Sequence, residues 1–179
     1  MTEQERERVY EMCRVLGLVF EVWKDGVLVG VFIYREVKII KLYVMTNRIT
    51  SENIFNLASH EVFVFGSNLG GKHGKGAAKT ALSWGAKWGQ ASGLQGRTYG
   101  IPTKDQTIRR TLSINEIKPF VDEFIDFAKE RQDLVFFVTE VGCGLAGLKP
   151  KDIAPLFKNA TELTNVHLPF RFWHKLQNP

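Results

Sequence analysis

The chain has 179 residues, and its 24 Lys and Arg against 19 Asp and Glu give a formal net charge of +5 at pH 7. An apolar fraction of 44% and a charged fraction of 24% are ordinary for a globular protein with one core, which excludes disordered and fibrous classes. No apolar run is long enough to cross a membrane and the first residues are charged, so we expect a cytoplasmic protein without a membrane partner. Cys13 and Cys143 lie far apart in the sequence, so we expect no disulfide framework, no metal site and no cofactor.

Positive charge is concentrated in residues 66–110. This segment holds eight Lys and Arg against one acidic residue, Asp105, a net charge of 8 minus 1, or +7, so the rest of the chain is slightly acidic. Such a basic segment indicates a ligand or partner that carries phosphate, nucleic acid included. A solvated basic surface without a ligand is the alternative interpretation.

The first third of the chain is rich in β-forming residues but carries no recognisable chemistry. Asp25-Gly26 separates two of its apolar runs, and this dipeptide is typical of a tight hairpin turn. We expect residues 1–36 to form an extension with a structural role, and residues 37–179 to form the main domain. The elements predicted here are a helix over 2–16 and strands over 18–23, 27–34 and 37–45.

In the rest of the chain, apolar runs alternate with segments of helical periodicity, which predicts an α/β sandwich. Ser113 and Glu116 have the spacing of a capping box at a helix start, and Trp84 and Trp88 are predicted to face the core from one helix. The predicted strands cover 62–65, 97–103, 134–139 and 166–168, and the predicted helices cover 50–57, 76–88, 113–131 and 150–159, before an aromatic tail at 170–176.

Two glycine-rich loops follow predicted strands, and the chain is organised around them. The first contains five glycines within eleven positions, from Gly66 to Gly76, interleaved with polar and basic residues; the second runs from Gly142 to Gly147. Glycine allows backbone N–H groups to approach an anion closely, and the first loop leads into a predicted helix N-terminus, which also favours phosphate. Because both loops lie at carboxyl ends of strands, we expect them to form one cleft.

One candidate motif is a phosphate loop of the G-x-x-x-x-G-K-[ST] type. Residues 66–72 fit this pattern, and Glu140 after an apolar strand resembles a metal-positioning acid. His73 stands where the pattern needs a hydroxyl group to hold magnesium, and further glycines follow where the helix should begin. A P-loop-like nucleotide hydrolase is therefore a less favoured alternative.

Three segments together resemble a macrodomain of the Appr-1''-p processing family. They are VFVFGSN with its glycine loop and Gly-Ala-Ala helix, YGIPTKD, and TEVGCGLAGLKPKDIAPLF, and the resemblance covers residues 37–168. It is nearest to the branch that contains the terminal ADP-ribose glycohydrolase. The resemblance implies a three-layer α/β/α fold with a mixed sheet that binds ADP-ribose, and several members remove ADP-ribose from proteins or nucleic acids or process its derivatives.

The resemblance also assigns roles to the two loops. It implies that the first loop faces the distal ribose and its linkage and that the second wraps the diphosphate with backbone amides, as their glycine content independently indicates. Cys143 is interpreted as a small packed side chain, since no local base accompanies it. The ligand-binding residues that we predict are Gly66, Ser67, Asn68, Gly70, Gly71, Lys72, Gly74, Lys75, Gly76, Gly142, Cys143, Gly144, Leu145, Ala146 and Gly147.

The chain departs from the family pattern at two functional positions. Asn47-Arg48-Ile49 stands where the family has a Gly-Asp-Ile segment whose aspartate contacts adenine, and Ala146 stands where the glycohydrolase branch has a catalytic aspartate. Cleavage would therefore depend on other groups, and the candidates are His73, Lys79, Asp105 and Glu140, each of which has a non-catalytic alternative role.

These observations lead to a functional expectation with alternatives. We expect a protein that binds ADP-ribose or a related NAD-derived nucleotide, free or attached to a macromolecule, and that hydrolyses an ADP-ribose linkage or its terminal phosphate. The absence of the aspartate after Leu145 favours the alternative of a non-catalytic binding module or nucleotide sponge. Nucleic-acid binding through the basic segment is a third hypothesis.

Overall fold

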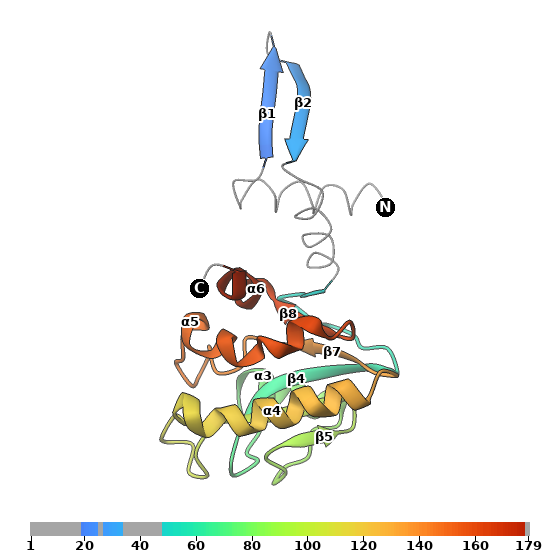
Figure 1. Cartoon of the computed structure of the whole chain (residues 1–179). Coiled ribbons are helices and arrows are strands. Elements are labelled where there is room, and N and C mark those ends of the chain that lie inside the picture. Colours follow the sequence, from blue (N-terminus) through green and yellow to red (C-terminus); the bar gives the residue numbers. More distant parts are fainter. Residues whose placement is uncertain (1–18, 25–26, 34–47, 178–179) are drawn as a thin grey trace. The chain divides into compact units, whose positions relative to one another are not determined.

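The computed structural model describes residues 19–24, 27–33 and 48–177, and the chain forms two compact units, Met1–Arg48 and Ile49–Pro179. In the first unit, β1 (Val19–Lys24) and β2 (Val27–Ile33) pair antiparallel, which confirms the two predicted strands of the hairpin (Figure 1). The helix predicted over 2–16 and the strand predicted over 37–45 lie outside the described residues.

The second unit is built on a six-stranded mixed sheet, which confirms the α/β class (Figure 1). The strand order is β3-β8-β7-β4-β6-β5, with β5 antiparallel to β6 and every other neighbouring pair parallel. The strands are β3 (Ile49–Thr50), β4 (Glu61–Asn68), β5 (Gly93–Gln95), β6 (Thr98–Lys104), β7 (Val135–Val138) and β8 (Val166–Pro169).

The helices of the second unit include one long element and several short ones. The predicted capping box is confirmed: the Ser113 hydroxyl accepts from the Glu116 N–H, and the Glu116 carboxylate accepts from the Ser113 N–H. The helices are α3 (Gly76–Ala81), α4 (Ile114–Glu130), α5 (Pro150–Ile153) and α6 (Phe170–Gln177), with 3₁₀ turns at Leu82–Trp84, Ala154–Phe157 and Asn159–Glu162.

Three predicted helices differ from the structure, and the one predicted over 150–159 is the short α5 followed by 3₁₀ turns at Ala154–Phe157 and Asn159–Glu162. Residues 51–57 form no helix, and Thr50, the predicted start of that helix, ends β3, where its hydroxyl donates to the His167 carbonyl of β8 at 2.9 Å. The helix predicted over 76–88 ends at Trp84, because Gly85 adopts φ +101°, the left-handed conformation that terminates helices. The first core strand is longer than predicted and includes Gly66, Ser67 and Asn68.

The core lies on both faces of the sheet. On one face, Phe63 and Phe65 of β4 pack with Ala78 and Ala81 of α3. The alternate β4 residues point to the other face, where Tyr99 of β6 packs edge-on against Phe124 of α4 with ring centroids 5.1 Å apart. Helices α3 and α4 therefore cover opposite faces of the sheet (Figure 1).

The sheet topology brings the two glycine loops together. β4 and β7 are adjacent parallel strands, and each leads directly into one of the loops at its carboxyl end. In open α/β sheets the crevice at such a position is the usual ligand site. No helix among the described residues combines the length and apolarity needed to cross a bilayer.

Candidate functional site

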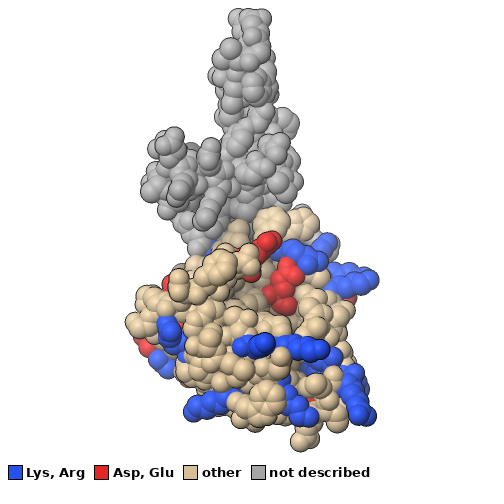
Figure 2. Space-filling model, turned by 180° about the vertical axis from the view of Figure 1, so that it is seen from behind, with Lys and Arg blue, Asp and Glu red and all other residues tan. Residues whose placement is uncertain are grey.

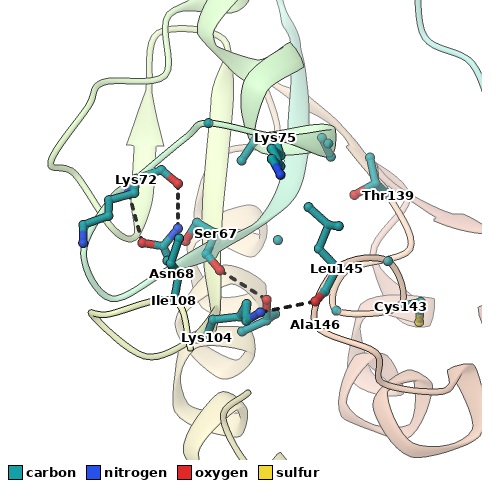
Figure 3. A pocket seen from close by; sticks show the side chains of 18 of the residues that line it. Ser67, Asn68, Lys72, Lys75, Lys104, Ile108, Thr139, Cys143, Leu145 and Ala146 are labelled. Atoms are coloured by element: carbon teal, nitrogen blue, oxygen red, sulfur yellow. Dashed lines mark hydrogen bonds between the residues drawn. The ribbon is translucent and has the colours of Figure 1, made fainter. Parts of the chain in front are cut away.

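A cavity of about 730 Å³ lies between the two glycine loops, and we call it the loop cavity (Figure 3). Its volume is within the range of small-molecule sites. It is lined by 12 of the 15 residues predicted to bind ligand, all except Gly70, Gly71 and Gly147. The lining residues that the sequence analysis did not assign are Ala77, Ala78, Trp88, Thr103, Lys104, Ile108 and Thr139.

Gly70 and Gly71 hold the first loop against neighbouring backbone instead of lining the cavity. A Cβ atom on Gly71, which has φ +60°, would lie 2.4 Å from the carbonyl carbon of Gly89, and one on Gly70 would lie 2.6 Å from the carbonyl oxygen of Gln106. No side chain fits at either distance. Both glycines are therefore required by close backbone packing.

Asn68 and Ser67 use their side chains to shape the first loop. The Asn68 Oδ1 accepts from the Lys72 N–H at 3.0 Å and its Nδ2 donates to the Lys72 carbonyl at 2.7 Å (Figure 3). The Ser67 hydroxyl donates to the Ala91 carbonyl. Both residues are buried, so they fix the course of the loop at the cavity wall.

The second loop offers consecutive backbone N–H groups beside the cavity. The Leu145 carbonyl accepts from Lys104 Nζ at 3.3 Å (Figure 3), and the Ala146 carbonyl accepts from the Thr111 hydroxyl at 2.7 Å. Within the described residues, the N–H groups of Gly144, Leu145 and Ala146 donate to no other group. Three successive free amides with their carbonyls held elsewhere resemble the backbone nests that bind anions.

Gly74 and Gly144 line the cavity at positions where the backbone does not require glycine. Neither has a positive φ, and no atom lies within 4 Å of the place where a Cβ would be on either residue. A side chain would therefore fit the fold at both positions and would occupy open space at the cavity wall. Glycine there keeps the cavity free for another occupant.

Basic side chains dominate the charge of the loop cavity. Lys72, Lys75 and Lys104 line it, and Lys75 points toward Leu145 across the space between the loops (Figure 3). The acidic lining residue, Glu140, accepts from Arg171 Nη1 at 2.8 Å. Lys and Arg side chains also run in a band across one face of the second unit (Figure 2). The cavity is suited to a negatively charged ligand.

Three of the four candidate catalytic residues do not line the loop cavity. His73 is fully buried with its ring edge-on to Phe65, because it packs into the core under the loop. The Asp105 carboxylate closes a turn by accepting from the Thr107 hydroxyl at 2.7 Å, a bond that lowers its pKa. Lys79 is exposed on α3. Of the four, Glu140 alone lines the cavity.

Cys143 lines the cavity as a protonated thiol. Burial, reinforced by the nearby charge of Glu140, raises its pKa to about 11, and its Sγ lies 3.8 Å from the Val141 carbonyl oxygen. A thiol with this pKa has almost no thiolate at neutral pH and is a weak nucleophile. The geometry agrees with a packed side chain.

Trp88 is the main lining residue whose place was predicted wrongly. The sequence predicts it in the core on one helix face with Trp84, but the helical segment ends at Trp84, and Trp88 is 65% exposed and lines the loop cavity. Gly85 was the sequence signal for this ending. Ile108 was also missed; it lines the cavity with φ +62°, an unusual conformation for a β-branched residue.

A second cavity of about 920 Å³ adjoins the first, and we call it the edge cavity because it contains β3, the edge strand of the sheet. Its walls are formed by residues 49–55 and 169–171, including the aromatic rings of Phe55 and Phe170. It shares three lining residues, Ala77, Thr139 and Glu140, with the loop cavity. The two cavities therefore meet at the carboxyl end of β7.

The chain was compared with protein-family models, with curated proteins and with solved structures, and none of the three comparisons finds a match.

Proposed function

We propose that this protein binds ADP-ribose or a closely related NAD-derived nucleotide in the loop cavity and the adjoining edge cavity. The observation that carries the proposal is the combination of three free amides at Gly144–Ala146 with the open space left by Gly74 and Gly144. A site with glycines in place of larger residues and with unpaired backbone N–H groups is suited to a phosphate that approaches the chain closely.

The architecture supports a macrodomain-like sandwich. The sheet is mixed, helices cover both of its faces, and the two glycine loops follow adjacent parallel strands. A macrodomain has these features, and the glycine loops and the YGIPTKD segment resemble those of a macrodomain. The proposed family and the proposed ligand therefore depend on the same residues.

The shape of the site supports an extended ligand. In the proposed arrangement, the diphosphate binds the second-loop amides, the distal ribose lies by the first loop, and the adenosine half occupies the edge cavity. Phe55 and Phe170 provide aromatic surface for a base there, and Thr139 lies on the wall shared by the two cavities. A ligand with a charged centre and a flat apolar end would place its charge at the second-loop amides and its flat end at the aromatic residues of the edge cavity.

Binding is better supported than hydrolysis. Glu140, the candidate catalytic residue that lines the cavity, is held by Arg171, and a general base needs a free carboxylate beside the attacking water. Cleavage is a second candidate function, because Glu140 lines both cavities at their junction. In that case Arg171 would have to release the carboxylate when ligand binds.

Calorimetric titration of the full chain with ADP-ribose tests the proposal, followed by chromatography of the same sample for products. We expect saturable binding with a Kd in the micromolar range or tighter, which corresponds to a favourable binding free energy of about 8 kcal/mol or more. Gly144→Leu should abolish binding because its side chain enters the cavity, whereas Asn115→Leu places a leucine side chain on the exposed start of α4, outside the lining of the cavity, and should leave binding unchanged. Equal affinity for ADP-ribose in both variants would contradict the proposed site.

A further inference from the structure

The loop cavity has an apolar side that ADP-ribose does not explain. Six large hydrophobic side chains are prominently exposed among the described residues, and three of them, Trp88, Ile108 and Leu145, line this one cavity. Trp88 is 65% exposed and Leu145 is 68% exposed. Apolar side chains that gather at a concave site without covering each other mark a surface for an apolar group of a ligand.

Trp88 is held in place by hydrogen bonds on both sides of it in the chain. The Lys87 N–H donates to Gln95 Oε1 at 2.6 Å, the Lys87 carbonyl lies 3.1 Å from His73 Nε2, and the Gly89 N–H donates to the Gly71 carbonyl at 2.9 Å. These contacts connect the segment around Trp88 to the first glycine loop. An exposed tryptophan on a fixed backbone loses little conformational entropy when a ligand stacks on it.

The buried ring of His73 supports Trp88 from the protein side. The two rings meet edge-on with centroids 6.4 Å apart, and His73 is fully buried against Phe65. Since Nε2 lies at hydrogen-bond distance from a carbonyl, it carries the proton; Nδ1 has no partner among the described residues. His73 therefore positions the tryptophan and does not itself reach the ligand.

We propose that the loop cavity accepts a planar, uncharged heteroaromatic ring, attached beyond the distal ribose of the bound nucleotide, and that Trp88 stacks on this ring. The inference rests on the proposed function and specifies the ligand further. ADP-ribose would occupy the second-loop amides and the edge cavity, but it carries no aromatic ring beyond its distal ribose. A dinucleotide with a ring at each end would use both aromatic surfaces, those of Phe55 and Phe170 in the edge cavity and Trp88 in the loop cavity.

The charges of the loop cavity favour a neutral ring over a cationic one. Lys72, Lys75 and Lys104 line it, while Glu140 is paired with Arg171. A tryptophan face attracts a cation, but the ammonium groups of Lys75 and Lys104 at the cavity oppose a further positive charge, whereas the Lys72 side chain extends away from it (Figure 3). Reduced nicotinamide adenine dinucleotide has a neutral distal ring, and the oxidised form has a positively charged one. Comparing the affinities of these two dinucleotides therefore tests whether the cavity prefers a neutral or a cationic ring.

The test is calorimetric titration of the full chain with three probes: ADP-ribose, the reduced dinucleotide and the oxidised dinucleotide. The wild type is expected to bind the reduced dinucleotide about 10-fold more tightly than ADP-ribose, because only the dinucleotide has a distal ring that can stack on an aromatic side chain. Trp88→Ala should remove this preference and change ADP-ribose affinity less than threefold. Leu82→Ala removes an exposed apolar side chain that lines neither cavity and should keep the preference.

The outcomes separate the two proposals. If the wild type binds ADP-ribose and the reduced dinucleotide equally well, or if Trp88→Ala weakens both equally, the ring site is wrong and the proposed function stands. Tighter binding of the oxidised than of the reduced dinucleotide overturns the choice of a neutral ring. If none of the probes binds, the proposed function is wrong, and the ring site with it.

Discussion

Gly66 and Gly142 bring the carboxyl ends of β4 and β7 into close contact: a Cβ on Gly66 would lie 3.2 Å from the backbone nitrogen of Gly142. This distance is tighter than ordinary van der Waals contact, so the two glycine loops begin side by side. A few residues earlier, Val64 of β4 lies opposite Val138 of β7, and this strand register brings Gly66 next to Gly142. The loop cavity therefore depends on small residues at the strand ends as well as on the loops.

The glycines of the first loop should differ sharply in their tolerance to substitution. Gly71→Ala should lower the free energy of unfolding by about 2 kcal/mol or more, because alanine in a left-handed conformation costs about 1–2 kcal/mol and its Cβ would overlap the Gly89 backbone. Gly74→Ala should change stability little, since nothing lies within 4 Å of its Cβ. Urea unfolding of both variants measures the difference, and similar stability losses would contradict the structure of this loop.

Glu116 should make stability depend on acid pH. The Arg110 guanidinium and the Ser113 N–H lower the pKa of its carboxyl from 4.5 to about 2. A carboxyl with a depressed folded-state pKa stabilises the protein above the unfolded pKa, and this contribution is lost as pH falls from about 4.5 to about 2. Glu116→Gln should therefore flatten the pH profile of urea unfolding in this window, whereas Glu130→Gln at the far end of α4 should not. If the free energy of unfolding depends on pH in the same way in the wild type and in Glu116→Gln, the pKa of Glu116 is not lowered by these contacts.

Cys143 should be unreactive at neutral pH. Because burial raises its pKa to about 11, the thiolate that reacts with iodoacetamide is scarce at pH 7 and its population rises tenfold per pH unit up to about pH 11. The rate of alkylation, followed by mass spectrometry in a Cys13→Ser variant, should show this slope. A rate that already levels off near pH 8 would mean that the thiol is not buried as described.

The Thr111 hydroxyl should influence ligand binding at the second glycine loop without itself lining the cavity. It donates to the Ala146 carbonyl at 2.7 Å and so helps to orient the three free amides. Thr111→Val removes this bond with little change of shape, and the loss of one hydrogen bond of about 0.5–1.5 kcal/mol should weaken ADP-ribose binding roughly 2- to 10-fold. Ser83→Ala removes a hydroxyl that donates to the Thr80 carbonyl away from the loop, and should leave affinity unchanged. Unaltered affinity in Thr111→Val would show that the loop holds its shape without this bond.

Local sequence signals were sufficient for the elements that surround the site. The apolar runs at 62–65 and 134–139 predicted β4 and β7, and the capping box at Ser113 predicted the start of α4. Each signal acts within a few residues of the chain. The rule that ligands bind at the carboxyl ends of the strands in such sheets predicted one cleft for the two loops, while the adjacency of β4 and β7 was not predicted.

The composition of the cavity wall depended on contacts between distant segments. Trp88 lies at the cavity because its neighbour Gly89 packs against Gly71 of the first loop. Lys104 lies there because its ammonium group donates to the carbonyl of Leu145, which is 41 residues further along the chain. Thr50, predicted to start a helix, likewise lies in β3 because this strand pairs with β8, and its hydroxyl donates to the His167 carbonyl.

Sequence by itself determined that two glycine loops end two buried strands and that the surrounding segment is basic. Only the tertiary structure decided which side chains those loops leave accessible. It placed His73 in the core, Asp105 in a turn and Trp88 at the cavity, because burial depends on what the folded chain packs against each residue, and residue type alone does not specify that neighbour.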